Sequence, residues 1–306
     1  MAEIKVTSKR FEGVNEDPFA EVQLKQIFNN GRATDKWLTE MRDPEGEWRE
    51  LAGTGTVHSE NYRLVSNKQV HDLMTAALER MKGDSITFEP IQKLTGSTMS
   101  PILWTGKRFS ERWYTRDISV QPKDGGKVFL GVEAANSYDG DCKVKIAFYG
   151  LHCRCNNQYV SNNLLGQPFT LPHTMASPDM DENIDEVIRT VATKAAAFGA
   201  IVSNLDRLCD WKFDNTMQWM DFLNNCEERT GLVLNDRKIR LELAGHGITS
   251  QIPELGLSEG QFYADPHSMY GLLQAVSAVN THDCPGLGGA DKTSRFLDFA
   301  IDWVEG

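Results

Sequence analysis

The chain has 306 residues, a length typical of one large domain or two ordinary ones, and its 40% hydrophobic and 25% charged residues are typical of a globular protein. Its formal net charge of −11 excludes a uniformly basic nucleic-acid-binding protein, although a local basic patch stays compatible with it. There is no run of 18 apolar residues and no apolar core of a signal peptide at the N-terminus, so we expect no membrane span and no export. The six cysteines then favour reduced thiols in a cytoplasm.

The first 60 residues are polar and rich in turn signals. The segment Asp43-Pro44-Glu45-Gly46 has the composition of a turn, and we expect Trp37 and Trp48 to anchor this region on a core. We therefore predict an irregular N-terminal region over residues 1–60.

A short strand and an amphipathic helix are predicted next. Tyr62–Asn67 is the strand, and Asn67 is the predicted N-cap of a helix over residues 67–82 that ends at Gly83. Apolar residues recur along it at spacings of three and four, as on a buried helix face. These residues are Val70, Leu73, Met74, Ala77, Leu78 and Met81.

The middle of the chain carries the clearest strand pattern. An apolar run, Val128–Val132, precedes the turn-prone residues Asn136–Gly140, and apolar side chains then recur at every second position from Val144 to Phe148. A period of two is typical of a strand with one buried face. Asp139-Gly140 between two such runs predicts a β-hairpin, because glycine adopts a positive φ without steric cost. Residues 61–160 are therefore the predicted sheet-rich half.

Helix signals dominate residues 176–306, with a flexible loop predicted at Pro285–Gly289. The predicted helices span residues 180–209, 215–230, 267–280 and 294–304. The fold class that follows is α+β, with a central antiparallel β-sheet packed by several helices in a single domain over residues 1–306.

Charge is distributed unevenly along this predicted domain. Residues 101–160 carry nine Lys and Arg against six Asp and Glu, whereas residues 176–306 carry ten against 21. A basic sheet beside an acidic helical half is compatible with an anionic ligand on the sheet, and equally with chance and solubility.

Aromatic and basic residues are interleaved between residues 103 and 120. Single-stranded nucleic-acid sites need cations along the phosphates and aromatic faces on which bases stack, so this pattern predicts such a site. The candidate residues are Trp104, Lys107, Arg108, Phe109, Arg112, Trp113, Tyr114, Arg116, Lys143, Lys145 and Arg154. The alternative interpretation is that the aromatic residues belong to the core and the arginines to a solvated face.

Two further chemistries were weighed against this one. His152, Cys153 and Cys155 lie close together in the sequence, but the second pair of ligands that marks a zinc site is missing, so we predict no metal and no other cofactor. Asp139, Cys155 and His173 could form the catalytic set of a cysteine- or metal-dependent hydrolase. No phosphate-loop, Gly-x-Ser-x-Gly or HExxH pattern supports an enzyme, so a non-catalytic protein is the preferred prediction.

Several segments resemble, in order, the motifs of DUF932, a phage and plasmid family of unknown function. Tyr62–Asn67 resembles its Y-x-V-V-x-N motif, Asn136–Gly140 its N-S-H-D-G-S motif, and Met269–Val276 its W-G-L-L-N-A-V-T motif. The matching residues singled out as a possible site are Asn136, Asp139, Gly140, Cys155, Asn156 and His173. Tyr138 replaces the histidine of the family motif, which favours a structural turn over a catalytic histidine there.

The chain also resembles, in general character, the single-stranded-DNA-binding RNA polymerase cofactors of N4-like phages. This resemblance implies a non-catalytic homo-oligomer that coats single-stranded DNA and helps a phage RNA polymerase, or a replication or recombination protein, to engage it. A third hypothesis is an interaction protein that binds a host factor through the acidic helical half.

Overall fold

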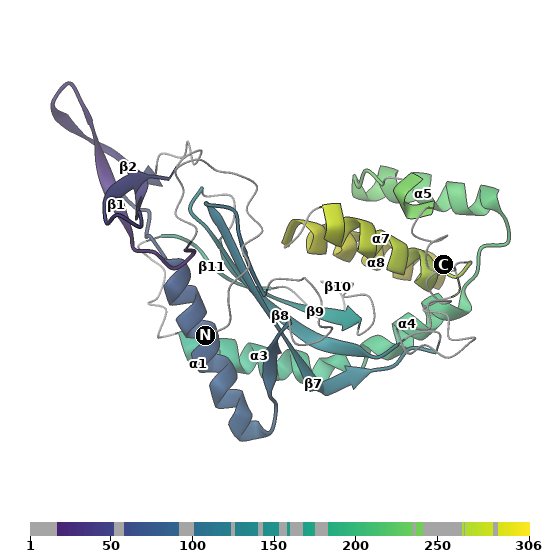
Figure 1. Ribbon diagram of the computed structural model, residues 1–306. Coiled ribbons are helices and arrows are strands. Elements are labelled where there is room, and N and C mark those ends of the chain that lie inside the picture. Colours follow the sequence, from purple (N-terminus) through teal and green to yellow (C-terminus); the bar gives the residue numbers. More distant parts are fainter. Residues whose placement is uncertain are drawn as a thin grey trace. The chain divides into compact units, whose positions relative to one another are not determined.

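The computed structural model describes twelve segments of the chain (Figure 1). These are residues 17–51, 58–91, 101–123, 126–139, 143–152, 158–159, 168–174, 183–234, 237–240, 265, 267–283 and 287–306. The chain divides into two compact units that both combine distant parts of the sequence. The first unit comprises Met1–Trp113, Val132–Ala147 and Pro168–Ala192, and the second comprises Tyr114–Gly131, Phe148–Gln167 and Thr193–Gly306.

The first unit begins with a small antiparallel sheet rather than an irregular segment (Figure 1). Strands β1 (Val22–Asn29) and β2 (Arg32–Arg42) form a hairpin, to which β3 (Trp48–Glu50) and β4 (His58–Ser59) add at β2. Asn30-Gly31 closes the hairpin with positive φ at both residues, 49° and 75°. The prediction of an irregular region is therefore wrong for these residues. Apart from the buried Met41, the apolar side chains of these strands are half buried or exposed, which hides the alternation, but the Asn-Gly turn was a usable signal.

A seven-stranded antiparallel sheet confirms the predicted central sheet. Its strands follow the order β10-β9-β8-β7-β5, with β11 paired to β9 and β6 paired to β7. In chain order they are β5 (Phe88–Pro90), β6 (Ile102–Trp104), β7 (Arg108–Val120), β8 (Val128–Ser137), β9 (Val144–His152), β10 (Gln158–Tyr159) and β11 (Phe169–Leu171). The predicted hairpin is formed by β8 and β9. The α+β fold class is thus confirmed.

Six α-helices occur in the described segments. They are α1 (Asn67–Met81), α3 (Ile184–Phe198), α4 (Ile201–Asp210), α5 (Thr216–Thr230), α7 (Met269–Asp283) and α8 (Leu287–Glu305). A short 3₁₀ turn, η1 (Lys82–Asp84), follows α1.

Two helices differ from their predicted bounds. The helix expected over residues 180–209 is divided into α3 and α4 at Gly199-Ala200, because glycine is among the residues least favourable to a helix interior. Helix α8 begins at Leu287 and includes Gly288 and Gly289, which were expected in a flexible loop. Packing of α8 along α7 in the second unit, where the two lie side by side (Figure 1), outweighs the low helix propensity of these glycines.

Each unit has its own core. In the first unit, α1 buries all six apolar residues whose spacing predicted its inner face. In the second unit, aromatic rings from α8 surround Phe222 of α5, which is fully buried. Its ring centroid lies 5.8 Å from that of Phe296, and 5.3 Å from those of both Phe299 and Trp303.

Candidate functional site

Two of the segments that resemble DUF932 motifs lie against each other in the first unit. The backbone N–H of Asn67, at the start of α1, donates to the hydroxyl of Tyr138, just after β8, at 2.8 Å. The amide nitrogen of Asn136 donates to Asn67 Oδ1 and to the carbonyl of Val65, both at 2.9 Å. The side chains of Asn67, Asn136 and Tyr138 are at most 1% exposed. These contacts, here called the Asn136 network, fasten the start of α1 to the end of β8.

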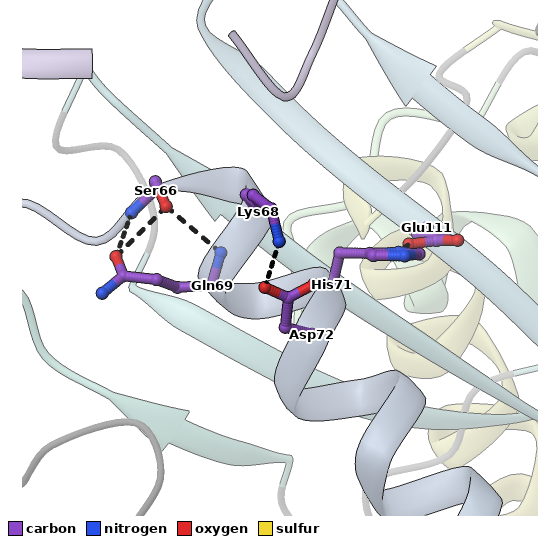
Figure 2. A network of polar contacts seen from close by, with 6 residues as sticks. All are labelled: Ser66, Lys68, Gln69, His71, Asp72 and Glu111. Carbon is purple, nitrogen blue, oxygen red and sulfur yellow. Dashed lines mark hydrogen bonds and ion pairs between the residues drawn. The ribbon is translucent and has the colours of Figure 1, made fainter. Parts of the chain in front are cut away.

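The start of α1 is capped by Ser66, one residue before the predicted cap (Figure 2). Ser66 Oγ accepts from the N–H of Gln69 at 3.1 Å, and Gln69 Oε1 accepts from the N–H of Ser66 at 2.8 Å. This reciprocal pair is a capping box. Asn67 is instead the first helical residue, and its amide nitrogen donates to the carbonyl of Pro18 at 2.8 Å. The Asn67 side chain therefore serves the core and not the helix end.

His173 lies beside Tyr62, the first residue of the segment Tyr62–Asn67. Its ring stacks on that of Tyr62 with centroids 5.3 Å apart, and Tyr62 stacks on His58 at 3.8 Å. His173 Nδ1 lies 3.2 Å from the carbonyl of Arg63, and His58 Nε2 lies 3.1 Å from Thr39 Oγ1. Burial lowers the pKa of both histidines, so both rings are held neutral. Sequence reasoning missed His58, because nothing near it in the chain signals the stack.

Asp139 bonds to two cations. Its Oδ2 accepts from Arg108 Nε at 3.2 Å and lies 3.4 Å from Lys107 Nζ, while the carboxylate itself is only 4% exposed. These cations sit at the turn between β6 and β7, which is tied to β8 by a bond from the N–H of Tyr138 to the carbonyl of Lys107. Lys143 is exposed and begins the return to β9, four residues after Asp139. We call Lys107 and Arg108 with Asp139 the basic corner.

The aromatic residues predicted to stack with bases are buried. Trp104, Phe109, Trp113 and Tyr114 are 4%, 2%, 6% and 0% exposed. Within the first unit, the Trp104 ring meets that of Tyr138 edge-on at 6.1 Å. This corrects the expectation of stacking faces in this stretch, since both faces of the sheet are covered along the middle of β7. The alternative interpretation, that these rings belong to the core, agrees with their burial.

The remaining predicted cations have different surroundings. Arg116 is exposed, and its guanidinium donates to the hydroxyl of Tyr114 from Nε at 3.2 Å and from Nη2 at 3.1 Å. Arg112 is only 2% exposed, and Lys145 is half buried. Arg112 is therefore no part of a solvent-facing site. Arg154 lies outside the described residues.

A buried acid explains the buried arginine. Glu133, in the middle of β8, is 1% exposed. Burial raises the pKa of its carboxyl, while the charge of Arg112, the hydroxyl of Ser110 and the charge of Lys145 act in the opposite direction. The signal for this cluster was a glutamate inside the apolar run of β8, which the sequence reasoning passed over.

The described residues provide no catalytic arrangement that supports the hydrolase hypothesis. Asp139 is held by two cations, and the Nδ1 of His173 is bonded to a backbone carbonyl. Gly140, Cys155 and Asn156 lie outside the described residues. Among the residues that the structure describes, no group of three or more His, Cys, Asp or Glu side chains is placed to hold a metal ion. None of the helices it describes is both long enough and apolar enough to cross a membrane.

Comparison with known proteins adds no identity: neither the models of protein families, nor the curated proteins, nor the solved structures contain a match to this chain. The resemblance to DUF932 therefore remains a hypothesis that rests on the motif residues themselves. The structure adds that four of these segments or residues, Tyr62–Asn67, Asn136, Tyr138 and His173, are joined by direct contacts.

Proposed function

We propose that the chain is a non-catalytic protein that binds single-stranded nucleic acid, with its phosphate contacts at the basic corner. The observation that carries the proposal is the sharing of one buried carboxylate by two partly exposed cations. The side chains of Lys107 and Arg108 are 32% and 52% exposed, and Asp139 is their common partner.

This arrangement favours an anionic ligand on electrostatic grounds. The formal charges of Lys107 and Arg108 exceed that of Asp139 by one, and the exposed Lys143 adds a further positive charge four residues along the chain. The bond to Arg108 Nε orients the guanidinium, whose planar fork of donors matches the geometry of phosphate oxygens. Preorganised cations of this kind supply the salt-dependent part of nucleic-acid affinity.

The acidic composition of the rest of the chain gives the proposal its context. The net charge of the chain is −11, and this negative charge disfavours non-specific adhesion to nucleic acid away from the basic corner. In this proposal the protein acts in the cytoplasm of a phage-infected cell as a homo-oligomer, and its acidic helical half presents the bound strand to an RNA polymerase or to a replication or recombination protein. These partners follow from the resemblances and from the charge distribution.

The test is fluorescence anisotropy with labelled dT and rU oligonucleotides and a duplex, each at two salt concentrations. We expect salt-dependent binding to the single strands alone. In the variant Lys107→Ala/Arg108→Ala the slope of log affinity against log salt falls by about 0.7 for each phosphate that the protein no longer neutralises. Arg80→Ala is the matched control, because Arg80 is an exposed cation of the same unit that pairs with Asp185.

Two results would contradict the proposal. One is no binding to any single strand at low salt, and the other is an unchanged salt slope in the double variant. Absence of binding would direct attention to the hydrolase hypothesis, for which rapid alkylation of Cys155 or stoichiometric zinc in the purified protein would be the supporting measurement.

A further inference from the structure

A pocket of about 480 Å³ opens in the first unit beside the start of α1. Phe19, Val22, Leu64 and Trp48 provide its apolar walls, and Lys68 and Gln69 belong to its polar side. This volume lies in the range of about 300–1,000 Å³ that is typical of pockets for small organic groups. The pocket is therefore large enough for one planar heterocycle.

Trp48 is the unusual residue of this pocket. Its side chain is 38% exposed, although tryptophan is highly buried on average. The backbone position is fixed, because Trp48 pairs with Arg42 in the ladder between β3 and β2. A partly exposed indole at the wall of an open pocket is suited to stack on a ligand ring, and stacking on aromatic side chains is one way in which single-stranded nucleic acid is bound.

Gln69 and Lys68, on the polar side of the pocket, can contact a base and its phosphate. Gln69 Oε1 is occupied by Ser66, so the amide nitrogen is turned away from Ser66 (Figure 2) and can donate to a base carbonyl. Lys68 is engaged by Asp72 in a solvent-exposed pair four residues apart, a weak interaction that a phosphate can displace. Glu21, also at the pocket, is neutralised by Arg42 at 3.0 Å.

A hydrogen bond connects the elements that carry the pocket and the basic corner. The start of α1, which carries Ser66 and Gln69, is bonded to Tyr138 through the N–H of Asn67. Tyr138 directly precedes Asp139, the carboxylate of the basic corner. The pocket and the basic corner therefore belong to the same unit and are joined through Asn67 and Tyr138.

We propose that this pocket receives one unstacked nucleobase of the bound strand, with Trp48 as the stacking platform, Gln69 as the donor to the base and Lys68 as the contact to the adjacent phosphate. This inference rests on the proposed function. It transfers the aromatic part of the site from β7, whose rings are buried, to an edge strand of the small N-terminal sheet.

The experiment compares two labelled oligonucleotides of equal length, dT and an abasic strand that has the same phosphates without bases. We expect the full chain to bind dT roughly 5- to 150-fold more tightly than the abasic strand, the factor that stacking of one base provides. Trp48→Ala should remove this preference without changing the affinity for the abasic strand or the salt slope. Trp48→Phe, which keeps a ring, should restore most of it.

Phe28→Ala is the matched control, because Phe28 is a 64% exposed aromatic residue of the same small sheet outside the pocket. Equal binding of both strands by the wild type, or a full dT preference in Trp48→Ala, would overturn the pocket while the salt-dependent binding proposed for the basic corner survives. Failure of both strands to bind at low salt would overturn the proposed function and the pocket together.

Discussion

The two units of the molecule organise their interiors differently. In the first unit, directional hydrogen bonds cross the core: Asn67, Asn136 and Tyr138 are at most 1% exposed and bond to one another. In the second unit, the centre is the ring cluster around Phe222, in which Phe296 and Trp303 meet Phe222 edge-on at interplanar angles of 80° and 88°. The first interior adds matched donors and acceptors to its apolar packing, and the second is centred on packed aromatic rings.

This difference determines how each interior responds to change. A buried hydrogen bond contributes little net stability when it is made, but a buried group left without its partner costs about 1–3 kcal/mol. An aromatic cluster loses stability in proportion to the volume removed and to the cavity that remains. The first unit should therefore be sensitive to small polar changes, and the second to loss of volume.

The largest expected effect is in the second unit. Phe222→Ala removes the ring shared by four aromatic neighbours, Phe213, Phe296, Phe299 and Trp303, and should lower the free energy of unfolding by about 3–5 kcal/mol. Urea titration followed by far-UV circular dichroism measures this change. Phe222→Leu, which retains most of the volume, should lose clearly less. A loss below about 1 kcal/mol for the alanine variant would show that the cluster is not the centre of this core.

A smaller loss is expected from the Asn136 network. Asn136→Ala leaves Asn67 Oδ1 and the carbonyl of Val65 without their donor, at a cost of about 1–3 kcal/mol. Tyr138→Phe removes the acceptor of the Asn67 N–H, with a cost in the same range. Because both residues act through Asn67, the losses should not add in the double variant.

Urea titration of the two single variants and the double variant completes this thermodynamic cycle. Ser203→Ala is a suitable control, because its exposed hydroxyl bonds to a backbone carbonyl on the surface of α4, in the second unit. Strict additivity of the two network variants would show that the bonds are independent, and the contrast between the two interiors would lose its basis.

The same contrast explains which features could be predicted from the sequence. The inner face of α1 was predicted residue by residue, because a helix that packs on one side repeats its apolar residues every three or four positions. Exposure along β7 could not be predicted in this way. Where both faces of a sheet are covered, alternation between aromatic and basic residues no longer indicates which side chains reach solvent.

Other features depend on contacts between distant parts of the chain. The stack of His58, Tyr62 and His173 joins residues more than 100 positions apart, and no local pattern reports such a contact. The motif resemblance did select Asn136 and His173, but it could not separate a structural role from a chemical one. Asn136 is buried and bonded to Asn67, so it supports the core, while His173 stacks on Tyr62.

The smallest expected effect is a pH dependence that arises from histidines of the first unit. The hydrogen bond to Glu111 at 2.6 Å raises the pKa of His71 (Figure 2), with burial opposing it and the charges of Glu111, Asp72 and Lys68 contributing less. Its pKa in the folded chain lies above the unfolded value of 6.5, so this stabilisation is fully present below pH 6.5 and is lost as the pH rises through the raised pKa. His58 and His173 have lowered pKa values, so their contribution is present above pH 6.5 and is lost as the pH falls.

The variant His71→Gln should therefore lose more stability at about pH 5.5 than at about pH 8.5, by roughly 1 kcal/mol or less, because the partly exposed pair with Glu111 is screened by solvent. His173→Gln should show the opposite dependence, since it removes a ring that resists protonation as the pH falls. The loss caused by Phe222→Ala should be the same at both pH values, because its contacts with phenylalanine and tryptophan rings involve no titratable group. Urea titrations of the three variants at the two pH values measure these differences. A pH-dependent loss in Phe222→Ala, or a pH-independent one in His71→Gln, would contradict the assignment of these pH dependences to His71 and His173.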